Sequence, residues 1–161
     1  MKLAFQGELG AFSHLAALEF FPKSKIKTCQ TFEECFKLAM DNSEYKIIIP
    51  IENSLAGRVA DIHYLIPKYK LQIYAEYFHS VIHNLVGLKG AKLENIKTVR
   101  SHSQAIGQCQ NIISKNNLKP IISADTAGSA KYISEKKDKT ESALASSLAA
   151  KIYGLEIIAG H

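Results

Sequence analysis

Short apolar runs alternate along the chain with segments whose apolar residues recur every three or four positions. Runs of the first kind favour strands, and segments of the second kind favour amphipathic helices. In the first half, the expected strands are 3–6, 25–29 and 45–51. The expected helices are 14–21, 32–40 and 61–69. The run at 45–51 is apolar throughout, which is typical of a strand buried on both faces.

The helix expected at 32–40 has the clearest pattern. Its apolar residues, spaced by three and four, are Phe32, Cys35, Phe36, Ala39 and Met40. Thr31 and Glu34 stand where a capping box begins a helix, with Thr31 as the N-cap. The sequence therefore predicts a helix that starts here and turns one face to the core.

The second half repeats the alternation after a long extended stretch. Residues 71–87 are rich in β-branched and aromatic side chains, which predicts a long strand pair that connects two lobes. The further strands are expected at 98–100, 121–122 and 156–159. The further helices are expected around 105–113, after Asp125, and over the alanine-rich 142–153, which Gly154 would close.

This order of elements predicts an α/β protein with parallel strands. Two lobes joined by extended crossings are similar in architecture to periplasmic-binding-protein-like (type II) folds, in which a ligand cleft lies between the lobes. We expect lobe 1 at about 1–75 together with the C-terminal end, and lobe 2 at about 76–156. Such an architecture predicts a small-molecule site and, by itself, no reaction.

Composition narrows the classes of protein. With 161 residues, 47% of them hydrophobic, the chain can form a substantial core. It has no apolar run near the roughly 20 residues of a membrane span and no signal-peptide pattern, so a cytoplasmic protein without membrane partners is expected. The net charge is +5, but only two arginines occur, so a small anionic ligand is favoured over nucleic acid.

The cysteines and histidines suggest no metal centre. Cys29, Cys35 and Cys109 are odd in number and lack CxxC spacing, so we interpret them as reduced core residues. The six histidines form no ligand spacing. Neither a metal nor a cofactor is expected.

Four strand-to-helix turns carry the candidate chemistry, because the first turn of a helix presents unpaired N–H groups that favour an anion. The first turn is Gly7 to Ser13, where two glycines allow close approach to a ligand. Its spacing is neither a dinucleotide fingerprint nor a P-loop. A tight turn with Ser13 as N-cap explains it equally well.

The second turn, Pro50 to Val59, places Glu52, Asn53 and Ser54 directly after the strand expected to be buried. A carboxyl group in that setting needs a partner or a raised pKa, so Glu52 is a candidate proton donor. The alternative is that Asn53 and Ser54 are simply helix caps.

The third and fourth turns lie in the second half. Ser101 and Gln104 fit a capping box, and His102 between them could bind an anion or move a proton. In the stretch from Ser123 to Ser129, Asp125 is a good N-cap, and small residues follow it. Together, the four turns favour a small dianion as the ligand.

Four blocks in this order and spacing resemble the prephenate dehydratase family. The blocks are Gly7 to Ser13 (GELGAFS), Pro50 to Val59 (PIENSLAGRV), Ser101 to Ala105 (SHSQA) with Gln108-Cys109, and Asp125 to Ala127 (DTA) with the helix leading to Tyr153-Gly154-Leu155. The second block is the most specific. The resemblance runs over essentially the whole chain.

The resemblance implies a lyase of phenylalanine biosynthesis that converts prephenate to phenylpyruvate, water and carbon dioxide without metal or cofactor. It implies a homodimer. The catalytic residues implied are Glu52, Asn53, Gln104 and Thr126. The substrate-binding residues implied are Gly7, Ser13, Ser54, Ser101, His102, Ser123, Asp125 and Ala127.

The chain departs from the family at its C-terminal end. The family has a Thr-Arg-Phe motif and often a regulatory small-molecule domain after the point where this sequence stops at His161. The missing Thr and Arg would serve catalysis and hold a carboxylate. We therefore expect the family fold with little or no activity in this chain. The alternative is a non-catalytic module of the same fold that binds a small carboxylate.

Overall fold

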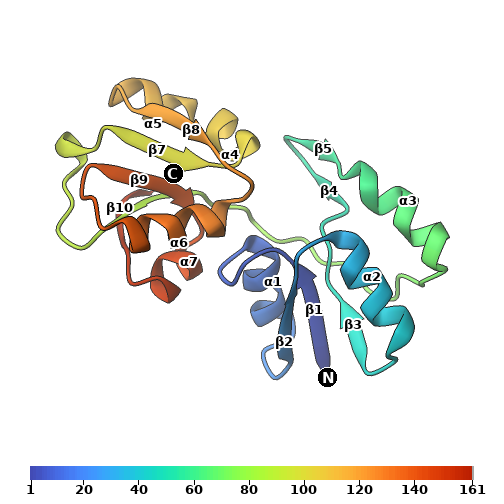
Figure 1. Cartoon of the computed structure of the whole chain (residues 1–161). Helices are drawn as coiled ribbons and strands as arrows, with labels where there is room; N and C mark the ends of the chain where they lie inside the picture. Colours follow the sequence, from blue (N-terminus) through green and yellow to red (C-terminus); the bar gives the residue numbers. More distant parts are fainter. Residues whose placement is uncertain (161) are drawn as a thin grey trace. The chain divides into compact units, whose positions relative to one another are not determined.

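The structure is a computed structural model that describes residues 1–160. The chain forms two compact units. Unit 1 comprises residues 1–8 and 12–80, and unit 2 comprises residues 9–11 and 81–161, of which the last residue lies outside the described part. Figure 1 labels most of the helices and strands of both units. The α/β organisation in two units, expected from the alternation of strands and helices, is confirmed.

Unit 1 contains a three-stranded parallel sheet in the order β2-β1-β3 and a separate two-stranded hairpin. Its strands are β1 (Lys2–Gln6), β2 (Lys25–Cys29), β3 (Tyr45–Ile47), β4 (Glu52–Asn53) and β5 (Gly57–Arg58). Its helices are α1 (Phe12–Phe20), α2 (Phe32–Asp41) and α3 (Ala60–Tyr69). The strands 2–6 and 25–29 and all three helices confirm the sequence predictions to within two residues.

Alternate residues of β1 point to opposite faces of the sheet of unit 1 and meet different helices. Phe5, fully buried, stacks on the ring of His14 from α1. Ala4 faces the other way and packs with Cys29 and with Cys35 from α2. The cysteines are free and buried, as the sequence predicts.

The start of α2 is a variant of the expected capping box. The side chain of Thr31 accepts a hydrogen bond from the N–H of Glu34 at 3.1 Å, so Thr31 is the N-cap. The carboxylate of Glu34 turns back to the N–H of Gln30, at 2.7 Å, rather than to that of the cap residue. Both bonds satisfy backbone donors around the helix start.

The strand expected at 45–51 is shorter than predicted and is not buried on both faces. The paired strand covers only Tyr45–Ile47, with one further bond from the N–H of Ile48 to the carbonyl of Ala4 in β1, and Ile51 has 36% of its surface exposed. β3 is an edge strand, so it has one neighbour where a central strand has two. The apolar character of the run did not predict burial correctly, because composition does not reveal where a strand lies in the sheet.

Unit 2 contains a five-stranded mixed sheet in the order β10-β6-β9-β7-β8. Its strands are β6 (Asn84–Gly87), β7 (Thr98–Ser101), β8 (Lys119–Ile122), β9 (Glu141–Ala145) and β10 (Glu156–Gly160). Its helices are α4 (Ser103–Gln108), α5 (Gln110–Lys115), α6 (Thr126–Lys136) and α7 (Ser147–Ile152), with the 3-10 turn η1 (Leu93–Asn95). β7 runs parallel to β8 and β9, whereas β6 is antiparallel to both of its neighbours.

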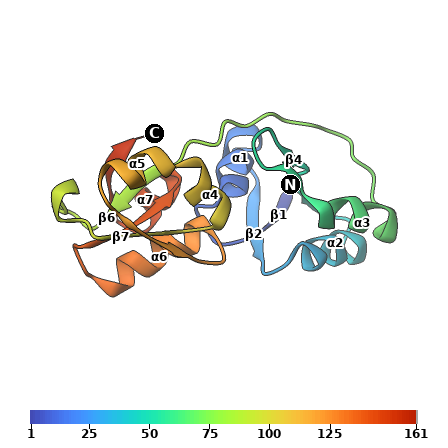
Figure 2. The same cartoon turned by 90° about the horizontal axis from the view of Figure 1, so that it is seen from above.

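Two apolar clusters cover the two faces of the sheet of unit 2. Leu85 and Leu144 point to one face and pack with Val99 and residues of α4 and α5. Val86 and Ala143 point to the other face and pack with residues of α6 and α7. Figure 2, seen from above, shows α5 and α6 on different sides of this sheet. The neighbouring residues of each strand therefore serve different clusters.

Three predictions for the second half are wrong in detail. Residues 71–83 form no strand, because only Asn84–Gly87 find backbone partners. The alanine-rich helix expected at 142–153 is a strand as far as Ala145 and a helix only from Ser147. The helix expected around 105–113 is broken at Cys109, whose ψ of 22° departs from helical values.

The last strand also lies elsewhere than expected. β10 pairs with β6, so residues 156–160 belong to unit 2 rather than joining the first lobe. Gly154 does close α7, with a φ of 65°. The N–H groups of Gly154 and Leu155 bond to the carbonyls of Lys151 and Ala150, which is a Schellman ending.

Candidate functional site

The ends of β7 and β8 bring two of the four candidate turns together in unit 2. The two strands are parallel neighbours in register, with Ser101 opposite Ile122. The N–H of Ser123 extends the ladder by donating to the carbonyl of Ser101 at 2.9 Å. The turns that follow, 101–104 and 123–127, therefore start side by side at the carboxyl edge of the sheet, where open α/β sheets bind ligands.

A compact hydroxyl network supports the turn after β8. The hydroxyls of Ser123 and Ser129 lie 2.5 Å apart, and Ser129 also donates to the carbonyl of Asp125 at 2.7 Å. Asp125 is the N-cap of α6, and its Oδ1 accepts from the N–H of Gly128 at 2.6 Å. A Cβ on Gly128 would come within 2.8 Å of that carboxylate, so a larger residue there would displace the carboxylate from its present position. The network holds the start of α6 in one geometry.

The first turn of α6 has donors to offer to an anion. The N–H groups of Thr126 and Ala127 have no acceptor within the helix, and Asp125 satisfies only Gly128. The side chain of Thr126 is half-buried, while that of Ala127 is fully buried. The carboxylate of Asp125 stands at the same helix end, so an anion here must sit to one side of it.

The turn after β7 is capped one residue later than predicted. His102, not Ser101, is the N-cap of α4, and its Nδ1 accepts from the N–H of Gln104 at 3.3 Å. Ser101 is fully buried, and its hydroxyl donates to the carbonyl of Leu144 in β9 at 2.8 Å. The capping-box prediction failed because Ser101 is the last residue of the strand and points into the sheet layer. Gln104 is exposed and its side chain is not used by the cap.

Arg100 lies on β7 beside this edge, and sequence reasoning assigned it no partner. Its guanidinium carbon lies 4.0 Å from the centre of the Tyr132 ring of α6, which is a cation–π contact. The stacking holds the arginine against the helix that carries the Asp125 network. The sequence shows an arginine in an expected strand and a tyrosine in a later helix. That pattern is too common to predict a contact between the two side chains.

The first candidate turn is divided between the two units. Gly7 ends β1 with a φ of 116°, and its N–H donates to the carbonyl of Cys29 at 2.9 Å. Gly10 belongs with unit 2, where a Cβ would lie 2.7 Å from the Cα of Ala149. The second glycine of the motif thus permits close packing against α7. Ser13 lies inside α1, which begins at Phe12, so its expected role as N-cap is wrong.

The second candidate turn is a hairpin rather than the start of a helix. β4 and β5 pair Glu52 with Arg58 and Asn53 with Gly57. The Oδ1 of Asn53 accepts from the N–H groups of Leu55 and Ala56, both at 2.9 Å, and so fixes the turn. Glu52 is exposed, so the argument that burial would demand a partner for its carboxyl group does not hold. Ser54 is exposed in the turn.

The candidate residues therefore fall into two sets. Unit 2 brings together Ser101, His102, Gln104, Ser123, Asp125, Thr126 and Ala127. Unit 1 contains Gly7, Ser13, Glu52, Asn53 and Ser54. Sequence reasoning missed Ser129, although its position four residues after Asp125 on a helix was a usable signal. Within residues 1–160, no three of the His, Cys, Asp and Glu side chains gather in a way that could hold a metal ion.

The fold and this edge define a class of protein. An α/β chain of two units, with polar turns and helix N-termini at the carboxyl ends of parallel strands, belongs among proteins that bind small polar molecules there. Comparison with known sequences identifies the member of that class. The chain belongs to the prephenate dehydratase family, whose model matches residues 3–161.

Curated relatives agree with this assignment. A bifunctional N-acyl-homoserine lactone acylase/prephenate dehydratase of Komagataeibacter europaeus is 40% identical over 156 residues, which are 97% of this chain and 56% of the relative. A chloroplastic arogenate dehydratase/prephenate dehydratase 1 of Arabidopsis thaliana is 38% identical over 99% of this chain and 41% of its own length. The chain thus spans about half the length of these relatives, or less.

Solved structures agree on the fold. GqqA, described as a novel type of quorum quenching acylase, is 38% identical with a TM-score of 0.92, over 99% of this chain and 59% of that one. A prephenate dehydratase of Staphylococcus aureus subsp. aureus Mu50 has a TM-score of 0.85 at 24% identity, over 100% of this chain and 60% of that one. No helix within residues 1–160 has the length and apolar character needed to cross a membrane.

Proposed function

We propose that this chain forms the catalytic part of a dehydratase that converts prephenate to phenylpyruvate in phenylalanine biosynthesis. The observation that carries the proposal is the pairing of two polar turns at the ends of β7 and β8, in a chain that the prephenate dehydratase family model matches from residue 3 to residue 161. In the reaction, the ring carboxylate leaves as carbon dioxide and its electron pair enters the ring. The ring hydroxyl leaves with one added proton as water.

The chemistry assigns different tasks to the two carboxylates of the substrate. The carboxylate that stays needs donors, and the N–H groups at the start of α6 with the Thr126 hydroxyl and the Gln104 amide are of the right kind. The carboxylate that departs leaves faster in surroundings from which water is excluded. We propose Thr126 and Gln104 as the residues that hold the first group, with His102, Ser123, Asp125 and Ala127 shaping the edge around them.

Protonation of the leaving hydroxyl requires an acid. Two of the candidates, Glu52 and Asp125, are carboxyl groups. The carboxylate of Asp125 caps α6, whereas Glu52 is exposed, and Asn53 stands next to Glu52 in a turn that the Asn53 side chain fixes. We propose Glu52 as the acid and Asn53 as a substrate ligand. Gly7, Ser13 and Ser54 complete the proposed set as substrate-binding or wall residues. Ser101 supports the edge from within, because its buried hydroxyl is bonded to the carbonyl of Leu144.

The test uses the full-length gene product that contains this chain. It is incubated with prephenate, and phenylpyruvate is followed by its absorbance; arogenate serves as a second substrate, with phenylalanine as the product. An acyl-homoserine lactone is the third, because the name of the Komagataeibacter relative includes that activity. We expect turnover of prephenate. Binding of prephenate without turnover of either ring substrate would replace the proposal with the non-catalytic module.

Two matched pairs of variants test the residue roles. Gln104→Ala should lower kcat/KM roughly 10- to 150-fold, as for a lost hydrogen bond to a charged group, whereas Ser103→Ala, exposed in the same turn, should not. Thr126→Val should lower kcat/KM while Thr126→Ser retains it. Equal losses in Gln104→Ala and Ser103→Ala, or in the two Thr126 variants, would contradict the assigned roles. We also propose that the protein is a homodimer and that it is cytoplasmic. Light scattering on the purified protein tests the homodimer through its molar mass.

A further inference from the structure

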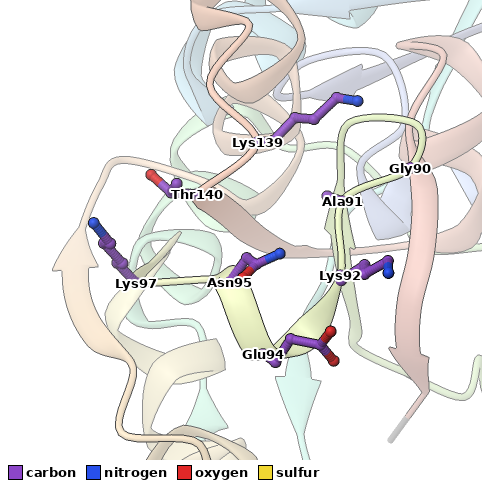
Figure 3. Close-up of a pocket in the computed structure, with 8 residues that line it drawn as sticks. All are labelled: Gly90, Ala91, Lys92, Glu94, Asn95, Lys97, Lys139 and Thr140. Atoms are coloured by element: carbon purple, nitrogen blue, oxygen red, sulfur yellow. The ribbon is translucent and has the colours of Figure 1, made fainter.

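The two units carry hollows of opposite character. Figure 3 shows a hollow of unit 2 whose lining carries charges of both signs, and there Lys97 points away from Lys92 and Lys139. Its side chains therefore do not converge on a ligand. The hollow of unit 1 has a volume of about 270 Å³ and a largely apolar lining, which consists of Met1, Phe21, Pro22, Lys23 and Ser24. This second hollow offers a place for an apolar side chain.

A bare stretch of backbone belongs to the same unit as the apolar hollow. Residues 72–80, here called the crossing segment, form no helix or strand. None of their N–H or carbonyl groups bonds to other backbone groups within residues 1–160. Figure 2 shows the crossing segment as part of a long loop that passes beside α1. Its side chains therefore decide how it is held.

Helix α1 holds one side of the crossing segment. The ring of Tyr77 stacks on that of Phe20, with 4.3 Å between the ring centres, and meets the ring of Phe21 edge-on at 5.3 Å. The Nδ1 of His79 lies 2.7 Å from the carboxylate of Glu19. Because both Tyr77 and His79 are fixed, the residue between them is held in one place.

That residue is Phe78, which points away from α1. Alternate side chains of an extended chain lie on opposite sides, so Phe78 faces away from the side of Tyr77 and His79. It is 89% exposed. Tyr74, four positions earlier, lies on the same side and is exposed as well. Apolar side chains that gather at the surface of a fixed segment are typical of an interface.

The exposed aromatic surface of the crossing segment matches what one partner of a dimer needs. An aromatic side chain has about 150–250 Å² to bury. From their exposed fractions, Tyr74, Tyr77 and Phe78 together present on the order of 400 Å². A standard interface buries about 800 Å² per partner, and somewhat more than half of it is apolar. That apolar share, about 450 Å², is close to the surface that the three side chains present.

The hollow lies next to this surface and fits its most exposed side chain. Phe21 lines the hollow and also contacts Tyr77, the chain neighbour of Phe78. A cavity of about 150 Å³ already accommodates benzene, so a hollow of about 270 Å³ has room for a phenyl ring. Within one copy, Tyr77 turns toward Phe21 and Phe78 turns away. A phenyl ring that fills the hollow therefore comes from elsewhere.

We propose that the hollow receives Phe78 of a second copy of this chain. The exchange is reciprocal, because about a two-fold axis each copy supplies one ring and accepts one. Unit 1 contains nine Lys and Arg residues and nine Asp and Glu residues, so no net charge opposes the approach of two such units. Lys23 at the hollow and Glu76 beside Phe78 have opposite charges, and neither is in an ion pair within residues 1–160. The interface rests on the homodimer proposed above and assigns the surface that forms it.

Light scattering and sedimentation of the 161-residue chain measure the dissociation constant of the dimer. Phe78→Ser removes both rings from a dimer. A buried aromatic anchor contributes about 30-fold or more to affinity, so the loss of two should raise the dissociation constant about a thousandfold. Ser24→Tyr fills the hollow and keeps Phe78, and it should raise the constant roughly tenfold or more. Tyr64→Ser is the control, because it removes an exposed aromatic ring from α3, and it should leave the constant unchanged.

The outcomes separate the interface from the homodimer. A dissociation constant that Phe78→Ser or Ser24→Tyr leaves unchanged, in variants whose circular dichroism shows the native fold, would overturn the interface alone. An equal rise for Tyr64→Ser would overturn it too, because general surface hydrophobicity would then explain the association. A monomeric wild-type chain would overturn both the interface and the homodimer.

A photo-crosslinker at position 78 shows what covers this residue in the full-length gene product. Chains in which benzoylphenylalanine replaces Phe78 are mixed with isotopically labelled chains, and the crosslinked peptides are identified by mass spectrometry. We expect crosslinks between labelled and unlabelled chains that end within residues 21–24. Crosslinks within one chain, or to another part of a second copy, would overturn the proposal. Turnover of prephenate, measured separately on the wild-type protein, tests the dehydratase independently of this interface.

Discussion

Ser146 offers a direct test of how the first candidate loop is held in unit 2. This side chain is 1% exposed, and its hydroxyl makes two bonds. It accepts from the N–H of Ala149 at 3.0 Å, as the N-cap of α7, and it donates to the carbonyl of Gly10 at 2.5 Å. The hydroxyl of Tyr153 adds a second bond, to the carbonyl of Leu9 at 2.9 Å. Ser146 therefore joins a helix start to residues 136 positions away in the sequence.

Replacing Ser146 by alanine removes both bonds and leaves the volume nearly unchanged. Loss of an N-cap costs about 1 kcal/mol. Removal of a partner from a buried polar group costs about 1–3 kcal/mol more. We therefore expect the free energy of unfolding to fall by about 3 kcal/mol, at the middle of the summed range. With a urea dependence of roughly 2 kcal/mol per molar, the midpoint should fall by about 1.5 M.

The assay is urea unfolding followed by circular dichroism, since the chain has no tryptophan. Ser134→Ala is the matched control, because the Ser134 hydroxyl is half-buried and bonds only to the nearby carbonyl of Lys131. It should cost less than about 0.5 kcal/mol, as for a surface substitution. If the two units unfold in separate steps, only the step of unit 2 should move. A loss for Ser146→Ala no larger than that of the control would refute the reasoning.

Three further predictions concern unit 1. The carboxylate of Glu33 accepts hydrogen bonds from Lys68 and Tyr69, both at 2.7 Å, which lower the pKa of Glu33 from 4.5 to about 2. The contribution of these bonds to the stability of the fold is therefore present above pH 4.5 and is lost as the pH falls toward 2. An NMR titration midpoint near 4.5 would contradict this contact. Thr31→Ala should cost about 1 kcal/mol in urea unfolding through loss of the α2 cap, while Thr31→Ser should cost little, and equal losses would count against the cap. Burial raises the pKa of the Cys35 thiol, so iodoacetamide at pH 8 should modify it far more slowly in the folded chain than in urea; equal rates would show that the thiol is accessible.

The sequence by itself predicted the local structure where neighbouring residues decide it. The cap at Thr31 and the helix of spaced apolar residues after it depend on contacts three or four positions apart. The glycine that closes α7 at Gly154 is a local requirement for a left-handed backbone. The Asp125 cap was predictable for the same reason. The family resemblance was also readable, because it resides in the residues themselves.

Tertiary structure decided what depends on distant partners. Residues 142–145 have the composition of a helix, yet they form most of the central strand β9, because β6 and β7 offer hydrogen bonds on both sides. Ser101 is not the helix cap that the sequence predicts, because its hydroxyl donates a hydrogen bond to the carbonyl of Leu144, 43 positions away. Gly10, expected to approach a ligand, packs instead against Ala149. Strand order and helix packing bring these partners together across long stretches of chain, and a linear pattern carries no record of which distant residues will meet.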